Sequence, residues 1–193
     1  MNSRLETAVG FSKDNRQYRE DLTFLLLRDS DLINKRILDI GSSCGGLGSY
    51  IRSLGLGCEV IDIDARSWQL PEDSTAIRGY AYHLSFGDSV FDIVISKGCI
   101  PILCAGDKLT SEIRARERTK QALEEAFRVT KPSGRIHMHW VPTIDTIRPV
   151  GLYDWEYNGQ KAVAETVVNY VDSLNSKGHK AKVIKNTLVI RKS

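Results

Sequence analysis

The chain has 193 residues, of which 41% are hydrophobic and 26% charged, so it is long enough for one domain with a sizeable core. Its net charge of +3 does not by itself indicate nucleic-acid binding, because proteins that bind the phosphate backbone usually carry a concentrated basic surface. No apolar run approaches the length of a membrane span and the N-terminus is polar, which predicts no membrane association and a cytoplasmic location.

Cysteine usage points away from a metal site. The four cysteines are Cys44, Cys58, Cys99 and Cys104. They form no Cys-x-x-Cys pair and show no histidine at ligand spacing, so no zinc site is predicted. We expect these side chains to be reduced thiols.

The first periodic segment covers residues 14–28. Its apolar positions Tyr18, Leu22, Leu25 and Leu26 lie on one helical face, which predicts an N-terminal helix laid on the domain. A polar connector follows at 29–35, and residues 1–35 together would form a helical cap. Tyr18 either packs half-buried against the domain or faces a bound ligand.

A strand, a tight turn and a helix are predicted over residues 37–51, ILDIGSSCGGLGSYI. An apolar run ends at Gly41, small residues follow, and Leu47 begins a helical apolar spacing. Such a turn points the free N–H groups of the helix past the carboxyl end of the strand, where nucleotide-like ligands bind in open α/β sheets. Asp39, near the end of this buried strand, needs a polar or cationic partner.

This stretch resembles the first motif of the class I S-adenosylmethionine-dependent methyltransferases, in which an apolar strand and an acidic residue precede Gly-x-Gly-x-Gly. Asp39, Gly41 and Gly45 match the motif, and Ser43 replaces its middle glycine. The resemblance implies S-adenosyl-L-methionine as cofactor, with its methionine part against the turn at Gly41, Ser43 and Gly45 and positioned with help from Asp39. The serine disfavours a nicotinamide-dependent oxidoreductase, because a dinucleotide fingerprint needs that glycine for close approach of the pyrophosphate.

A second strand is predicted over residues 58–64, CEVIDID, and it ends in an acidic residue. Asp64 stands roughly 20 to 25 positions after the first motif, as the ribose-binding carboxylate of nucleotide folds does. Asp62 points the same way in a strand with a period of two, so it is the alternative if the register differs. Otherwise either acid merely caps a turn.

A short helix at 66–73 and a brief third strand at 74–79 are predicted next. The stretch 79–86, GYAYHLSF, resembles the family's Gly-Asp-Ala-x-x-Leu-Pro-Phe, in which an acidic side chain and the following backbone hold adenine. Because Tyr80 replaces the acid, the resemblance implies that adenine meets the Tyr80 ring or the backbone around Ala81. Simple packing of Tyr80 is the alternative.

The fourth strand, 88–96 (DSVFDIVIS), resembles the family's Phe-Asp-x-Val strand, and Phe91, Val94 and Ile95 are expected in the core. Class I enzymes place their chemistry just after this strand, so Ser96 is a candidate cofactor contact. The segment lacks the Asn/Asp-Pro-Pro-aromatic set of base amino-methylases and the lysine and aspartate set of ribose methylases. A cytosine C5 methylase would need a proline next to Cys99, and we expect that thiol to be buried and structural.

A long charged helix is predicted over residues 107–129, and it ends in the family's pattern Glu-x-x-Arg-Val-x-Lys-Pro-x-Gly before a fifth strand at 135–141. Its inward residues would be Ala115, Ala122, Leu123, Ala126 and Phe127. In the fifth strand His137 and His139 share one face, while Ile136, Met138 and Trp140 take the other.

His139 lies nearer the carboxyl end of the fifth strand than His137. It is the candidate catalytic base if the acceptor is a hydroxyl or ammonium group that must lose a proton. A satisfied, partly buried histidine is the alternative.

The rest of the chain predicts an irregular acceptor-side loop at 142–158, a helix at 160–176 and a β-hairpin formed by 180–184 and 187–191. The expected fold is a three-layer α/β sandwich in a single domain, 1–193, with the cofactor-binding core at 36–141. Its seven-stranded sheet would be mostly parallel, with an antiparallel C-terminal hairpin and helices on both faces.

The inferred reaction is transfer of the sulfonium methyl group of S-adenosylmethionine to an unidentified acceptor. A compact chain without an added recognition domain favours a small molecule, although a nucleic acid or protein acceptor remains open. The alternative from another class is a non-catalytic methyltransferase-like binding module or partner subunit. Nothing in the sequence indicates an oligomeric state.

Overall fold

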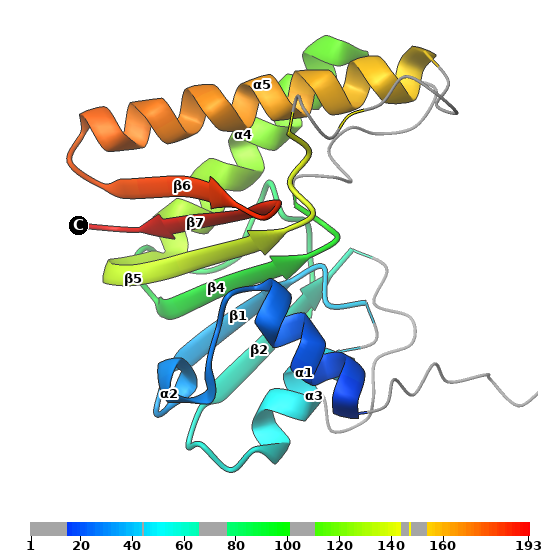
Figure 1. Cartoon of the computed structure of the whole chain (residues 1–193). Helices are drawn as coiled ribbons and strands as arrows, with labels where there is room; N and C mark the ends of the chain where they lie inside the picture. The colour runs from blue at the N-terminus through cyan, green and yellow to red at the C-terminus, as the bar shows by residue number, and fades with distance from the viewer. Residues whose placement is uncertain (1–14, 44, 66–76, 101–110, 144–146, 148–153) are drawn as a thin grey trace, which may run out of the picture.

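Seven strands form a single sheet in the computed structural model, which describes residues 15–43, 45–65, 77–100, 111–143, 147 and 154–193 (Figure 1). The strands are β1 Arg36–Ile40, β2 Glu59–Asp64, β3 Ile77–Arg78, β4 Phe91–Lys97, β5 Thr130–His139, β6 Lys180–Ile184 and β7 Thr187–Arg191. Their order across the sheet is β3-β2-β1-β4-β5-β7-β6.

The first five strands are parallel, and β7 inserts antiparallel between β5 and β6. This confirms the predicted mostly parallel sheet with its antiparallel hairpin. A dinucleotide-binding sheet in the 3-2-1-4-5-6 order has no such antiparallel insertion. Because neighbouring parallel strands end at the same edge, the residues at the carboxyl ends of β1, β2, β4 and β5 gather there.

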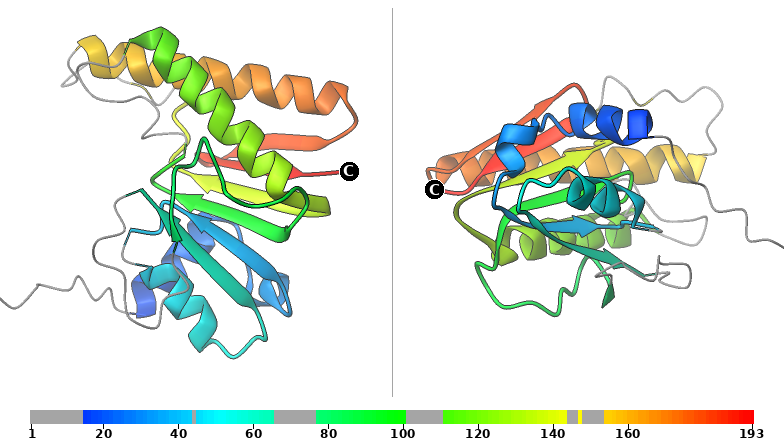
Figure 2. Two further views of the ribbon diagram at one scale, coloured as in Figure 1. Left: turned by 180° about the vertical axis from the view of Figure 1, so that it is seen from behind. Right: turned by 90° about the horizontal axis from the view of Figure 1, so that it is seen from below.

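Helices cover both faces of the sheet (Figures 1 and 2). They are α1 Asn15–Phe24, α2 Asp29–Leu32, α3 Gly46–Ser53, α4 Glu112–Val129 and α5 Asp154–Ser176. The first and third helices pack on one face, and α4 and α5 pack on the other. In the described part of the chain, no helix combines the length and apolarity needed to cross a bilayer.

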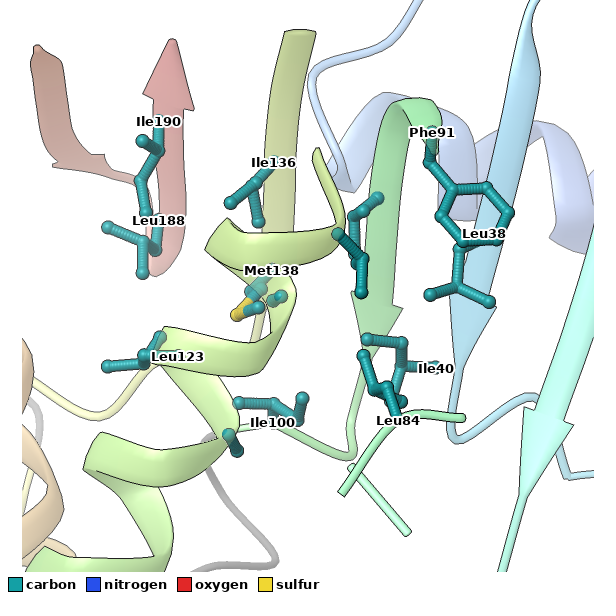
Figure 3. Close-up of a cluster of buried hydrophobic side chains, with 14 of the residues drawn as sticks. Leu38, Ile40, Leu84, Phe91, Ile100, Leu123, Ile136, Met138, Leu188 and Ile190 are labelled. Carbon is teal, nitrogen blue, oxygen red and sulfur yellow. The ribbon is translucent and has the colours of Figure 1, made fainter. Parts of the chain in front are cut away.

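The core has two layers because the central strands are buried on both faces. Leu38 and Ile40 of β1 point toward α4, where they join the larger cluster (Figure 3). Ile37, one position earlier, points toward α1 and α3. Asp39 follows the same alternation and therefore lies on the α1 and α3 face, within a strand whose other buried residues are apolar. The expected core residues Phe91, Val94 and Ile95 are all fully buried.

The N-terminal helix ends earlier than its apolar pattern predicts. Leu26 has a φ of 58°, and the N–H groups of Leu26 and Leu27 donate to the carbonyls of Thr23 and Leu22, which is a Schellman ending. Leu26 is consequently 38% exposed and does not belong to the buried face. The connector predicted after it contains the short helix α2.

The boundaries of α5 and of β5 also differ from the sequence prediction. The helix expected at 160–176 begins at Asp154, so the last part of the predicted loop 142–158 is helical. Trp140 lies beyond the end of β5, with a φ of 72° and 56% exposure, and so does not belong to the strand's apolar face. The predicted helix at 66–73 and the segments 74–76, 107–110, 144–146 and 148–153 lie outside the described residues.

The core can be tested on α4, which carries a fully buried Leu123 and an Ile113 that is 70% exposed. We expect Leu123→Ala to lower the free energy of unfolding by about 2–5 kcal/mol, because it removes buried methyl groups and leaves a cavity. Ile113→Ala, the control on the same helix, should change it by less than about 0.5 kcal/mol. Urea unfolding followed by circular dichroism measures both, and equal losses would contradict the assigned burial.

Candidate cofactor and acceptor site

The turn between β1 and α3 has a left-handed backbone at three positions. Gly41, Ser43 and Gly45 have φ values of 76°, 55° and 71°. Glycine adopts such angles without strain, whereas serine does so at a cost of roughly 1–2 kcal/mol. The Gly41 N–H donates to the carbonyl of Ile63 at 2.8 Å, which fixes the start of the turn against β2.

Asp64 is hydrogen-bonded to this turn. Its Oδ2 accepts the backbone N–H of Ser43 at 2.9 Å, and its side chain is almost completely buried. This bond offsets part of the strain at Ser43, because a charged acceptor makes a stronger hydrogen bond than a neutral one. The structure therefore brings together the first motif and the acid predicted to hold the ribose.

Protein atoms fill the space beside Gly41 of the motif and beside Gly46, the first residue of α3. A Cβ at Gly41 would lie 2.1 Å from Cβ of Cys99, which belongs to the segment after β4. A Cβ at Gly46 would lie 2.1 Å from the Tyr18 hydroxyl of α1. Tyr18 also stacks on Tyr50 at 5.6 Å between ring centroids, so it packs on α3 close to the turn. Close packing within the protein thus already excludes larger residues here.

Ser96 sits beneath the same turn and is completely buried. Its hydroxyl donates to the carbonyl of Ile40 at 2.9 Å and accepts the N–H of Ile100 at 3.0 Å. These bonds tie the end of β1 to the segment that follows β4. The sequence placed Ser96 among the cofactor contacts, and the contacts observed for its hydroxyl hold the backbone around the site.

Acidic side chains gather under α3. Asp39 and Asp62 are register partners on β1 and β2, and both are buried. Oδ2 of Asp62 accepts from Arg52 at 3.0 Å, while its Oδ1 is buried without a partner among the described residues. Glycine at position 48 makes room for Asp62, because a Cβ there would lie 2.1 Å from Oδ1.

Asp39 has a pKa well above its usual range. Burial is the main cause, and the negative charges of Asp62, Asp21 and Asp64 raise the pKa further, while Arg52 lowers it. No hydrogen bond to the Asp39 side chain is found within the described part of the chain. The partner expected from the sequence is therefore only the more distant Arg52 charge.

Tyr80 and Ala81 follow β3 next to the end of β2. The N–H of Gly79 donates to the backbone carbonyl of Asp64 at 3.2 Å, which anchors this segment to the ribose candidate. The Tyr80 ring is 48% exposed and stacks on Tyr82 at 5.4 Å. Ala81 packs on the core instead.

His139 lies at the same edge of the sheet but on β5, two strands from β1. Since neighbouring strands are about 4.8 Å apart, roughly 10 Å separates the lines of β1 and β5. The register partner of His139 on β4 is Lys97, whose Nζ pairs with Asp21 of α1 at 2.5 Å. Burial lowers the pKa of His139, the Lys97 charge lowers it further, and Asp21 raises it.

Sequence reasoning missed Asp21, Lys97 and Thr187. Asp21 stands on the buried side of α1 next to Leu22, and a charged residue on an apolar helical face is a signal that the sequence did offer. Thr187 follows no motif, and only the pairing of β7 with β5 brings it opposite His139. Among the described residues, no three metal-ligating side chains form a group that would hold an ion.

The sequence profile of a family described as a methyltransferase domain matches residues 38–138, slightly more than half of the chain. The chain belongs to this methyltransferase domain family. The matched region runs from β1 to β5 and includes the turn, Asp64 and the acidic cluster. Membership confirms the resemblance inferred from the motifs and implies S-adenosylmethionine as the methyl donor.

Solved structures share the fold of this methyltransferase domain at low sequence identity. Human N-acetylserotonin methyltransferase in complex with S-adenosylmethionine is 18% identical with a TM-score of 0.58, and the match covers 92% of this chain and 52% of that one. This chain thus spans about half the length of the human enzyme. A Pyrococcus horikoshii protein is 21% identical with a TM-score of 0.54, covering 94% and 95% of the two chains.

A third similar structure is a Staphylococcus aureus protein provisionally named as a caffeoyl-CoA O-methyltransferase. It is 17% identical with a TM-score of 0.57, and the match covers 94% of this chain and 85% of that one. A search of curated protein sequences finds no match to this chain.

The unpaired acceptors of the site suit S-adenosylmethionine, which carries a positive sulfonium, an ammonium group and two ribose hydroxyls. Oδ1 of Asp62 and Oγ of Ser42 are buried without partners in the described part of the chain. Asp39 is a buried carboxyl with no hydrogen-bond donor there. Burying such groups is costly, and a cationic ligand rich in donors would lower that cost.

The close contact at Gly41 can be separated from the strain of its backbone angle. Gly41 and Gly55 both have left-handed φ values, but a Cβ at Gly55 would meet nothing within 4 Å. We expect Gly55→Ala to cost about 1–2 kcal/mol in the free energy of unfolding from backbone strain alone. Gly41→Ala should cost about 1–3 kcal/mol more because of the clash with Cys99, and urea titrations compare the two. Equal losses would show that the turn relaxes freely.

The raised pKa of Asp39 predicts a pH-dependent stability. The folded state holds the Asp39 proton above pH 4 while the unfolded chain releases it near its usual pKa of about 3.9, so this residue makes stability fall as pH rises. Asp39→Asn removes the titration, and its stability gain over the wild type should grow from acidic to neutral pH, reaching at least about 1 kcal/mol.

The measurement is urea unfolding at several pH values. Asp172→Asn, which changes an exposed carboxylate on α5, is the control and should stay within about 0.5 kcal/mol of the wild type throughout. A gain for Asp39→Asn that did not vary with pH would contradict the raised pKa.

Proposed function

We propose that this chain is an S-adenosylmethionine-dependent methyltransferase that acts on a small-molecule acceptor. The observation that best supports the proposal is the hydrogen bond from the Ser43 N–H to Asp64, which joins the glycine turn to the predicted ribose acid. The family match over residues 38–138 supports the reaction type. Buried carboxylates beside the turn support a ligand that is positively charged.

Each predicted cofactor contact has a role that its chemistry supports. S-adenosylmethionine supplies, when bound, a methyl group on a sulfonium that is a good leaving group. The backbone at Gly41, Ser43 and Gly45 would accommodate its methionine part, and Asp64 would accept hydrogen bonds from the ribose hydroxyls. Asp39 and Asp62 would offer carboxyl oxygens to the hydrogen-bond donors of the cation. Tyr80 and Ala81 would contact adenine, and Ser96 would keep the turn in place.

The preference for a small acceptor rests on the net charge and on two proteins of similar fold. A net charge of +3 is small for recognition of a nucleic acid backbone. Two proteins of similar fold carry the small molecules N-acetylserotonin and caffeoyl-CoA in their names. Their identities are below 20%, so the names suggest a class of acceptor and no particular compound.

His139 is the residue that we propose as the proton acceptor for the methylated group. Its lowered pKa keeps the imidazole neutral at physiological pH, which is the form able to take a proton. Its place at the carboxyl end of β5 lies on the side of β4 away from the acidic cluster. Methyl transfer to a hydroxyl or an ammonium group requires such a base, whereas transfer to a thiolate does not.

The ribose assignment gives a direct binding test. Asp64→Ala removes a charged hydrogen-bond acceptor worth roughly 1.5–3 kcal/mol, so the Kd for S-adenosylhomocysteine should rise by about 10- to 100-fold. Isothermal titration calorimetry measures this Kd, and Asp172→Ala, an exposed carboxylate far along α5, is the matched control. Circular dichroism must first show that Asp64→Ala keeps the fold, because Asp64 also supports the turn. Unchanged affinity in a folded variant would make the ribose assignment wrong.

A further inference from the structure

Thr187 connects the candidate base to the end of α1. Its Oγ1 lies 2.7 Å from the backbone carbonyl of Phe24 and 2.8 Å from Nδ1 of His139. Thr187 is the register partner of His139 on the antiparallel strand β7, and both residues are buried. The three groups thus form a chain from helix carbonyl to hydroxyl to imidazole.

The direction of these hydrogen bonds follows from counting protons. A carbonyl oxygen only accepts, so the single hydroxyl proton of Thr187 is donated to Phe24. The hydroxyl oxygen then has only lone pairs to offer His139, and Nδ1 must carry the proton for the 2.8 Å contact to be a hydrogen bond. A neutral ring with the proton on Nδ1 has its lone pair on Nε2.

The surroundings of the ring hold it in place. Phe24 stacks on it with centroids 5.0 Å apart and planes 10° from parallel. No partner for Nε2 of His139 is found among the described residues, and the side chain keeps 7% exposure. The nearest charged groups identified are Lys97, its β4 neighbour, and Asp21, which pairs with Lys97.

We propose that Thr187 is a positioning residue that fixes His139 as the Nδ1–H tautomer, so that Nε2 offers a lone pair to a proton-bearing acceptor. The proposal deepens the proposed function and rests on it. It names the acceptor class as a hydroxyl or ammonium compound, because only a group that must lose a proton uses that lone pair. In the step, Nε2 takes the proton as the acceptor's electron pair forms the bond to the methyl carbon, and the bond from that carbon to sulfur breaks.

His137 supplies an internal control for the tautomer. Its Nδ1 donates to the carbonyl of Leu25 at 2.7 Å, so its tautomer is also fixed with the proton on Nδ1 but does not depend on Thr187. Leu25 is next to Phe24 at the end of α1, and a displacement of that helix end would therefore change His137 as well.

The test is nitrogen NMR of the histidine rings in the full chain at mildly alkaline pH, with signals assigned from His139→Gln and His137→Gln. The wild type should show His139 protonated on Nδ1. Thr187→Val, which keeps the shape and loses the hydroxyl, should shift His139 toward the Nε2–H tautomer, while Thr187→Ser, which keeps the hydroxyl, should show the wild-type pattern.

The His137 signals should be unchanged in both variants. A wild-type His139 protonated on Nε2, or a Thr187→Val spectrum identical to the wild type, would overturn the proposal. S-adenosylhomocysteine titration of the same samples is independent of this result. Failure to bind would count against the proposed function, whereas a wrong tautomer would count against the role of Thr187 alone.

Discussion

Two side-chain hydrogen bonds at the end of α1 fix the helix that covers the candidate site. The last carbonyls of a helix have no partner within it, and buried carbonyls without partners are costly. The Phe24 carbonyl accepts a hydrogen bond from the Thr187 hydroxyl, and the Leu25 carbonyl accepts one from Nδ1 of His137. Both donors lie on strands of the sheet. The sheet therefore sets where α1 ends, and with it where Asp21 and Tyr18 lie over the edge. Tyr18 reaches the turn and Asp21 reaches Lys97 because of this anchoring.

The acidic cluster under α3 lowers the stability of the fold but suits a binding site. Asp39 and Asp62 stand side by side on neighbouring strands and are nearly or completely buried, and among the described residues Asp62 forms an ion pair with Arg52. A fold selected for stability alone would place apolar residues at such positions. This protein does so two residues earlier on the same two strands, where Ile37 and Val60 are buried register partners. Buried carboxyl groups next to a strained turn are what a site for a cationic ligand would require.

The sequence predicted local elements better than contacts between residues far apart in the chain. The strand, turn and helix over residues 37–51 carry their own signals in apolar spacing and small residues, and the structure matches them. The sequence did not predict the early end of α1, because Leu26 adopts a left-handed φ that is usual for glycine. No glycine or asparagine at that position indicates a helix end. The contact of His139 with Thr187 joins residues 48 positions apart, and it depends on the register of β5 with β7. Sequence periodicity contains no information on such a register.

A binding module without catalysis would need the acidic cluster and the turn but would have no use for the arrangement around His139. Thr187 alone satisfies the Phe24 carbonyl, since its one proton is already donated there. An apolar side chain at position 139 would pack on Phe24 equally well and would avoid burying a polar ring beside Lys97. The imidazole therefore adds a ring nitrogen, Nε2, that has no partner among the described residues and lies at the carboxyl edge of the sheet. The proton acceptor that we propose at that place would serve methyl transfer to a hydroxyl or ammonium group and would serve no purpose in cofactor binding alone.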